Sequence, residues 1–295
     1  MIKLKTFLKT TGFIAAYTGI FFGSQIIYVL CATIFSTLVL HTEDLLGKNK
    51  EETLNIIETL AMENISNQAY ISFIFAAIVS LPIFYFIIKA RKQSIKEVIG
   101  FHKINAPNIF IVSILGAFLF LFISFLMSYI LQTGMFEESF NKAEEMFKFL
   151  TGGNVILGFL AIVVIGPLME ELLFRGLILY ELDKHINTYI AIIIQAVLFG
   201  LVHLNFYQLT YTVLIGIILG LAYVWLKSIW APIIIHVVNN GLSFALTTFS
   251  NVDDSAVDFT GVIYALWLFS MCMVVCMMVL IYKRRKIAPK NNLVL

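Results

Sequence analysis

The feature that most limits the fold of this 295-residue chain is a series of long apolar segments separated by short polar ones. A helix needs about 20 apolar residues to cross a bilayer. Within hydrocarbon every backbone N–H and C=O must find a partner inside the protein, which favours helices over irregular chain. The sequence therefore predicts an all-α polytopic bundle of about eight transmembrane helices. The expected spans are approximately 11–40, 69–89, 108–132, 154–180, 188–204, 210–227, 229–250 and 260–282.

The composition supports a membrane protein and excludes several other classes. Hydrophobic residues make up 60% of the chain and charged residues 13%, whereas a soluble domain has about a quarter of its residues charged. The net charge is only +2 and the basic residues lie in short flanks, so we expect no nucleic-acid partner. Cys31, Cys272 and Cys276 fall in apolar runs, which argues against a disulfide framework or a zinc knuckle.

The distribution of basic residues predicts the orientation of the chain. With both termini inside, 15 of the 20 Lys and Arg residues lie in cytoplasmic segments, as the positive-inside rule requires. We therefore predict a multi-pass membrane protein with both termini cytoplasmic, and the short loops indicate a bacterial cell membrane. Residues 1–105 form an N-terminal transmembrane hairpin and a basic cytoplasmic loop. Residues 106–295 form the core, with the informative motifs in 150–250 and a C-terminal span.

A charged cluster interrupts the fourth apolar segment. The stretch GPLMEELLFRG, residues 166–176, places two adjacent glutamates and an arginine where each charge costs about 2.5–3.5 kcal/mol at the helix centre. Side chains four apart share a helix face, so Glu171 and Arg175 can form an ion pair. Glu170 points about 100° away and lacks that partner. Two carboxyl groups in different environments are what acid–base catalysis requires.

Two later spans carry further polar side chains at helical spacing. Phe199 and His203 lie one turn apart in FGLVH, and His236 and Asn240 lie one turn apart in HVVNN. Each feature alone has a structural explanation, because a membrane His or Asn often bonds to a neighbouring helix and a Glu–Arg pair can serve packing. The GIILG stretch, 216–220, is typical of a close helix-packing face. Together, the charged and polar residues on three neighbouring helices predict one shared reactive site.

The chemistry of these residue types favours a hydrolase. A glutamate and a histidine facing one water can remove its proton, and a histidine with an asparagine can donate to the oxyanion that forms on a carbonyl. The membrane setting indicates a membrane-associated peptide or protein substrate. The sequence contains no His-Glu-x-x-His, Gly-x-Gly-Asp or rhomboid-like Gly-x-Ser-Gly motif.

The three motifs resemble those of a known family. EELLFR at 170–175, FGLVH at 199–203 and HVVNN at 236–240 look like Glu-Glu-x-x-x-Arg, Phe-x-x-x-His and His-x-x-x-Asn. These are the signature of the CPBP family (CAAX proteases and bacteriocin-processing enzymes, also called Abi), similar to type II CAAX prenyl endopeptidases. The resemblance covers about residues 150–250. It implies an eight-helix intramembrane protease of glutamate-dependent or metallo type.

The resemblance also implies a role for each motif residue. Glu170 would activate water with His203, and His236 with Asn240 would stabilise the oxyanion. The supporting residues would be Glu171, Arg175 and Phe199, the last of them packing beside His203. The family is often labelled a metalloprotease, and two His with two Glu could hold a zinc ion with a bound water. We favour metal-free water activation that requires no cofactor, because Glu170 and His203 suffice and asparagine is an unusual zinc ligand.

The expected partners are the bilayer and a membrane-associated substrate, such as a prenyl-CAAX protein, a peptide pheromone or a bacteriocin precursor; the oligomeric state stays open. Two other classes compete with peptide processing. A proton-coupled transporter would show an inverted repeat, and the sequence shows none. A non-proteolytic scaffold or bacteriocin self-immunity protein would bind a peptide or partner without needing Glu170 as a base.

Overall fold

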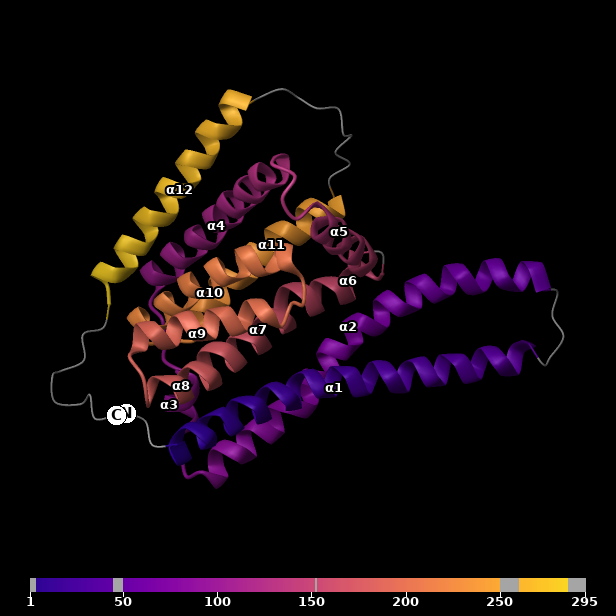
Figure 1. Cartoon of the computed structure of the whole chain (residues 1–295), viewed down its shortest axis with the longest axis horizontal. Coiled ribbons are helices and arrows are strands. Elements are labelled where there is room, and N and C mark those ends of the chain that lie inside the picture. The colour runs from indigo at the N-terminus through magenta and orange to yellow at the C-terminus, as the bar shows by residue number, and fades with distance from the viewer. Residues whose placement is uncertain (1–3, 45–49, 152, 250–259, 286–295) are drawn as a thin grey trace.

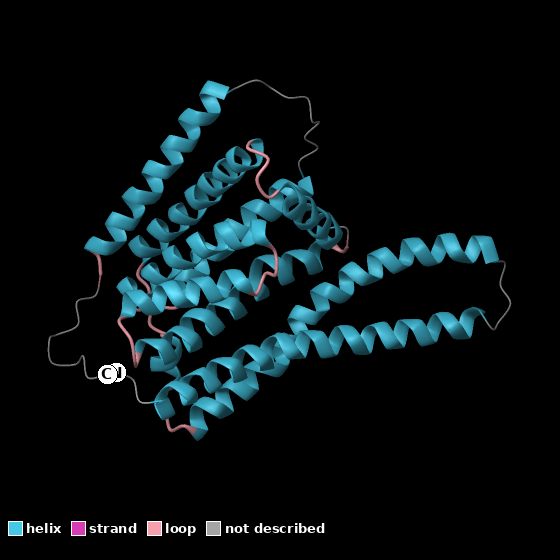
Figure 2. Cartoon of the chain, in the orientation of Figure 1, coloured by secondary structure: helices cyan, strands magenta, loops and turns pink. Residues whose placement is uncertain are grey.

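The computed structural model describes residues 4–44, 50–151, 153–249 and 260–285, and within these ranges it contains helices and turns but no strand (Figure 2). Lys3, Lys48, Lys286 and Lys290, which entered the orientation argument, lie outside the described residues. The helices in chain order are α1 (Leu4–Asp44), α2 (Lys50–Ala90), α3 (Ile95–Ile99), α4 (Ala106–Gln132), α5 (Glu137–Thr151), α6 (Val155–Gly158), η1 (Phe159–Ile165), α7 (Gly166–Glu171), η2 (Leu172–Ile178), α8 (Leu179–Asp183), α9 (Thr188–Leu201), α10 (Phe206–Leu226), α11 (Trp230–Phe249) and α12 (Thr260–Lys283). The predicted all-α polytopic bundle is confirmed.

Seven helices of the described chain are long and apolar enough to cross a membrane. They are Phe7–Phe35, Asn67–Ala90, Ala106–Gln132, Val155–Asp183, Phe206–Leu226, Trp230–Phe249 and Tyr264–Lys283. The remaining predicted span, 188–204, is the shorter apolar helix α9, which has only 14 residues. The helix ends early because the backbone turns at Val202–Asn205, where Leu204 adopts a positive φ of 53°.

Side-chain and backbone contacts nevertheless place the two ends of α9 at opposite faces of the bundle. On one face, near the start of α9, Arg91 pairs with Glu181, and Lys184 lies 3.3 Å from the same carboxylate. On the other face, just past its end, the Asn205 amide donates to the Ser139 carbonyl at 2.9 Å. The chain therefore passes through the bundle in α9 despite its length. Which face is cytoplasmic remains a prediction from the basic residues.

Asparagine caps explain where four of the helices begin. Asn105, Asn154, Asn187 and Asn205 precede α4, α6, α9 and α10, and each side-chain oxygen accepts from a backbone N–H of the first turn. An N-cap oxygen satisfies a donor that has no partner within the helix. These short polar links between apolar segments thus set the boundaries of the helices.

Figure 1 shows α1 and α2 as a long hairpin beside the bundle formed by α4 and α7–α12. Within that bundle α9 and α10 approach closely through small residues. A Cβ on Gly216 would lie 2.9 Å from the Cβ of Ala196, and one on Gly220 would lie 2.9 Å from Ile192. Glycine therefore permits the contact, which confirms the interpretation of GIILG as a packing face.

The fourth span departs from a regular α-helix on both sides of the glutamates. Two π-helical stretches, η1 and η2, flank α7, and the Gly166 N–H bonds to the Ala161 carbonyl five residues earlier. Pro167 has no N–H to continue a regular ladder, which accounts for the irregularity beside it. Short π-helical stretches are rare and occur frequently at functional sites.

Candidate active site

The innermost element of the site is a buried ion pair. Arg175 Nη1 donates to Glu171 Oε1 at 2.8 Å, and both side chains are fully buried. The guanidinium also donates from Nη2 to the Gly216 carbonyl at 3.3 Å and lies 4.5 Å from the centre of the Phe199 ring. The expected pairing of Glu171 with Arg175 is therefore present, and α10 and α9 both hold the arginine in place.

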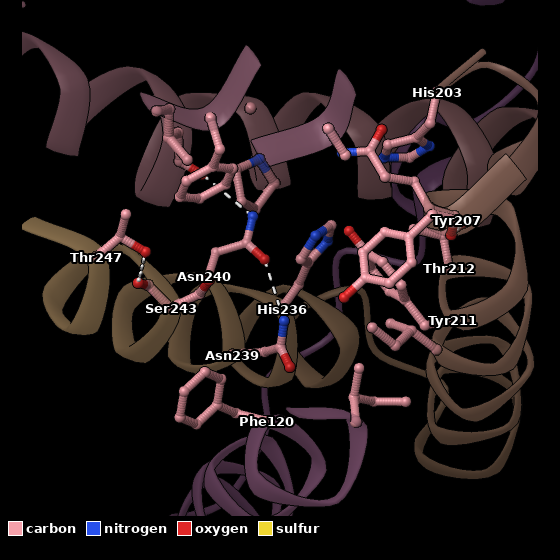
Figure 3. A pocket seen from close by; sticks show the side chains of 18 of the residues that line it. Phe120, His203, Tyr207, Tyr211, Thr212, His236, Asn239, Asn240, Ser243 and Thr247 are labelled. Atoms are coloured by element: carbon pink, nitrogen blue, oxygen red, sulfur yellow. Dashed lines mark hydrogen bonds between the residues drawn. The ribbon is translucent and has the colours of Figure 1, made fainter. Parts of the chain in front are cut away.

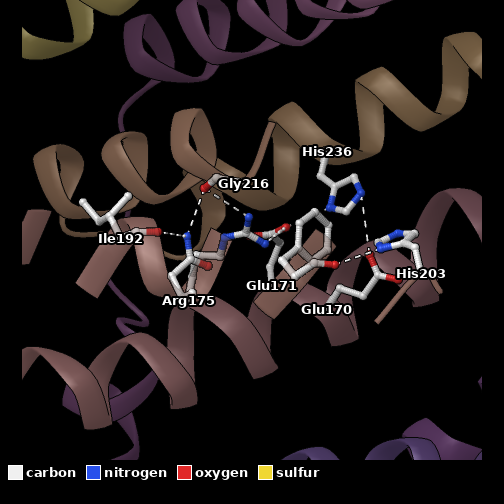
Figure 4. Close-up of polar contacts among 9 residues, drawn as sticks. Glu170, Glu171, Arg175, Ile192, His203, Gly216 and His236 are labelled. Atoms are coloured by element: carbon white, nitrogen blue, oxygen red, sulfur yellow. Dashed lines mark hydrogen bonds and ion pairs between the residues drawn. The ribbon is translucent and has the colours of Figure 1, made fainter. Parts of the chain in front are cut away.

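His236 joins this pair to the second glutamate. Its Nδ1 lies 2.8 Å from Glu171 Oε1, and its Nε2 lies 3.7 Å from Glu170 Oε2. Figure 4 shows the Glu170 carboxylate pointing toward the rings of both His236 and His203. The contact between His236 and Glu171 crosses from α11 to α7, and the sequence did not predict it.

His203 lies in the turn after α9 and is oriented by its own helix. Its Nδ1 is 2.8 Å from the Phe199 carbonyl oxygen. The Phe199 ring is edge-on to the His203 ring at 5.2 Å and to the His236 ring at 5.9 Å. Phe199 thus packs against both imidazoles, as well as against Arg175.

Asn240 is positioned by the irregular helix before the glutamates. Its Nδ2 donates to the Ile162 carbonyl at 3.2 Å, and its Oδ1 accepts from Asn239 Nδ2 at 3.2 Å. The Ile162 carbonyl lies in η1, five residues before Pro167, which has no N–H to offer. The proline and the π-helical stretch therefore leave a carbonyl that orients Asn240.

These groups meet at a cavity of about 560 Å³ enclosed mainly by α4, α5, α7, α10 and α11. Glu170, His203, His236 and Asn240 all line it, and Figure 3 shows the polar side chains of α11 facing it. The Glu170 side chain is 19% exposed, whereas that of Glu171 is inaccessible. The structure therefore brings the four residues predicted as catalytic to one cavity. It places Glu171 and Arg175 behind them.

One buried polar residue of the site was missed from the sequence. Gln195 of α9 is fully buried, and its Nε2 donates to the carbonyls of Ile192 and Gly216, each at 3.0 Å. It therefore shares the Gly216 carbonyl with Arg175. The signal was available, because Gln195 is a lone amide within an otherwise apolar segment.

Among the described residues no group of three or more His, Cys, Asp or Glu side chains is placed to hold a metal ion. The Nδ1 atoms of both histidines are engaged by Glu171 and by the Phe199 carbonyl, so only their Nε2 atoms are available as ligands. A zinc site requires three or four converging donors, so no step of the reaction is derived through a metal here.

One known family matches the part of the chain that carries this cavity. Residues 152–242 match the family described as type II CAAX prenyl endopeptidase Rce1-like. This segment, about a third of the chain, is therefore similar to the CAAX protease family. The matched range contains the four residues predicted as catalytic, Glu170, His203, His236 and Asn240. It also contains the buried Glu171, Arg175 and Gln195.

Two curated bacterial proteins are similar over part of the same length. The membrane-embedded CAAX protease MroQ of Staphylococcus aureus is 42% identical over 84 residues, which cover 26% of this chain and 34% of that protein. The putative membrane peptidase YdiL of Bacillus subtilis is 34% identical over 77 residues, covering 26% and 32%. The chain thus spans about a third of the length of these relatives. No solved structure matches. The apolar helices and these relatives identify a multi-pass bacterial membrane protein.

Proposed function

We propose that this protein is an intramembrane endopeptidase that hydrolyses a membrane-associated peptide or protein with water activated by Glu170. The observation that carries the proposal is the partly exposed Glu170 carboxylate, which lines a cavity beside two imidazoles and is backed by the buried Glu171–Arg175 pair. Intramembrane ionisable groups are costly and mark functional sites. The family match is consistent with peptidase activity.

In the proposed reaction Glu170 accepts a proton from water as the oxygen attacks the substrate carbonyl carbon. His203, which lines the same cavity, orients the same water. The carbonyl oxygen gains negative charge, and His236 and Asn240 stabilise it by donating hydrogen bonds. The tetrahedral intermediate then collapses. Its C–N bond breaks, and the proton held by Glu170 passes to the leaving nitrogen, which yields a carboxylic acid and an amine.

The proposal needs no metal, because carboxylate and imidazole suffice to remove the proton. A chelator test follows from this. Purified protein treated with EDTA and then dialysed is expected to retain its cleavage rate, because none of the assigned roles depends on a cation. Loss of cleavage that added zinc restores would contradict metal-free activation while leaving proteolysis intact.

The cavity also limits the substrate. Its wall is mostly apolar, with aromatic or sulfur side chains from α4, α5 and α10 such as Phe120, Met127, Phe140 and Tyr207. An extended peptide with bulky apolar side chains, or a lipid-modified one, matches such a lining. The substrate classes named from the sequence, prenyl-CAAX proteins and pheromone or bacteriocin precursors, all satisfy this condition.

The decisive experiment compares peptides from membranes and medium of cells carrying wild-type protein, Glu170→Gln, Glu181→Gln or no protein. Glu181 is a matched control, because it is also a buried carboxylate paired with an arginine but lies outside the cavity. A peptide processed with wild type and Glu181→Gln, but not with Glu170→Gln, is expected. If Glu170→Gln instead restores the deletion phenotype, the protein acts by binding, as a scaffold or immunity protein would.

A further inference from the structure

His236 lies between two carboxylates, and the two contacts are of different kinds. Its Nδ1 is within hydrogen-bond distance of Glu171 Oε1, at 2.8 Å, inside the protein. Its Nε2 faces Glu170 Oε2 at 3.7 Å on the cavity side. Glu171 also receives a hydrogen bond from the guanidinium of Arg175, so its oxygens act as acceptors. The contact at Nδ1 therefore requires a proton on that nitrogen.

The charges of the cluster do not balance without a further proton. From α7, Glu170 and Glu171 contribute two carboxylates, and from η2 only Arg175 contributes a cation. A net negative charge at low dielectric is costly unless a positive group accompanies it. The imidazole of His236 is the titratable group that contacts both carboxylates. A proton on Nε2 would point at Glu170 and make the cluster neutral.

We propose that His236 works as an imidazolium cation, with its Nδ1 proton held by Glu171 and its Nε2 proton directed at Glu170 and the cavity. This inference rests on the proposed function, since it states how the oxyanion donor is charged. A charged donor forms a hydrogen bond roughly twice as strong as a neutral one. His236 can then meet the developing oxyanion as a cation, and Glu170 remains ionised to receive the proton of water.

The second histidine of the cavity is held differently. His203 Nδ1 contacts the Phe199 carbonyl, which accepts a proton in a hydrogen bond but carries no charge. This contact places the proton of the neutral ring on Nδ1 and leaves Nε2 as an acceptor. His203 thus works as a neutral imidazole that accepts a hydrogen bond from water. The two histidines therefore differ in charge because Nδ1 contacts a carboxylate in His236 and a neutral carbonyl in His203.

The test is nitrogen NMR on the full-length protein in nanodiscs, with histidine labelled at both ring nitrogens, because the nitrogen signals report directly which ring nitrogens carry a proton. The chain has five histidines, and the His236 signal is assigned with His236→Gln or by elimination with variants of the other four. We expect both nitrogens of His236 to be protonated and only Nδ1 of His203. A bare nitrogen in His236 overturns the inference.

Two variants distinguish the effect of the Glu171 charge from a general disturbance of the structure. Glu171→Gln removes one carboxylate, so the cluster balances without the extra proton and His236 should become neutral. Glu181→Gln removes an equally buried carboxylate elsewhere and should leave the imidazolium in place. A His236 that stays charged in Glu171→Gln contradicts the role of Glu171. NMR needs no substrate, so a neutral His236 overturns this inference but leaves the peptidase proposal standing. Absence of cleavage would count against the peptidase proposal and not against the charge of His236.

Discussion

The buried ion pair behind the cavity offers a sharp test of how the site is held together. In Arg175→Met the guanidinium is lost, together with its bonds to Glu171 and the Gly216 carbonyl and its contact with the Phe199 ring. The Glu171 carboxylate, which has no solvent access, then retains only His236 as a partner. We therefore expect a large loss of stability rather than the small change of a surface substitution.

The magnitude follows from full burial at both ends of the pair. Removing one partner of a buried ion pair costs about 3–5 kcal/mol, here because two carboxylates, Glu170 and Glu171, then share His236 as their one cationic partner. At about 1.4 kcal/mol per factor of ten, the folding equilibrium should fall by roughly two to three and a half orders of magnitude. Adding Glu171→Gln to Arg175→Met neutralises the stranded carboxylate, so the double variant should be more stable than Arg175→Met alone.

The assay is reversible unfolding in bicelles, followed by the fluorescence of Trp225, Trp230 and Trp267. Arg91→Met provides the comparison, because its pair with Glu181 is partly exposed and should cost less. The reasoning fails if Arg175→Met unfolds at the wild-type midpoint. It also fails if the double variant is less stable than the single one, since the stranded charge would then not be the source of the loss.

Three further predictions concern separate parts of the molecule. Asn240→Ala should lower kcat by on the order of 10²–10³, as the loss of one oxyanion donor does, with KM little changed; an equal rise in KM would assign Asn240 to substrate binding instead. Ser139→Ala removes hydrogen bonds to Asn205 Oδ1 and from the Tyr207 N–H, worth about 1–3 kcal/mol together, so amide exchange in α5 should accelerate while exchange in α11 does not. Burial lowers the pKa of Lys184, opposed by Glu181, so its ammonium form costs stability until pH rises through the lowered pKa. The free energy of unfolding of the wild type should therefore rise relative to that of Lys184→Met as the pH approaches about 10.5. A difference between the two proteins that stays constant with pH would contradict this.

The membrane class and most helix positions could be predicted because apolar length is a property of the sequence alone. α9 shows where that reasoning ends. Its apolar segment extends through residue 204, but the helix stops at Leu201, and the turn before the Asn205 cap decides the boundary. Hydropathy does not register a turn made of apolar residues. The π-helical stretches around α7 were hidden for the same reason, although Pro167 marks the place.

The candidate site was predictable in its members but only partly in its contacts. Spacing along one helix predicted the Glu171–Arg175 pair, because both residues lie on the same helix. The bond from His236 to Glu171 depends on how α11 rotates against α7, which no one-dimensional pattern specifies. Asn240 likewise contacts the Ile162 carbonyl, whose availability depends on the irregular backbone of η1.

The shortness of α9 has a consequence for the surrounding lipid. Fourteen helical residues extend about 21 Å, whereas a typical hydrocarbon core is about 30 Å thick. The turn that ends α9 carries His203, and beside it Leu204 and Phe206 are 94% and 71% exposed. Local thinning of the bilayer is one of the ways in which a mismatch of this size is relieved. If the bilayer thins at this rim, a substrate of the proposed peptidase would cross less hydrocarbon there, and membrane thickness itself would become a variable that sets access to the cavity.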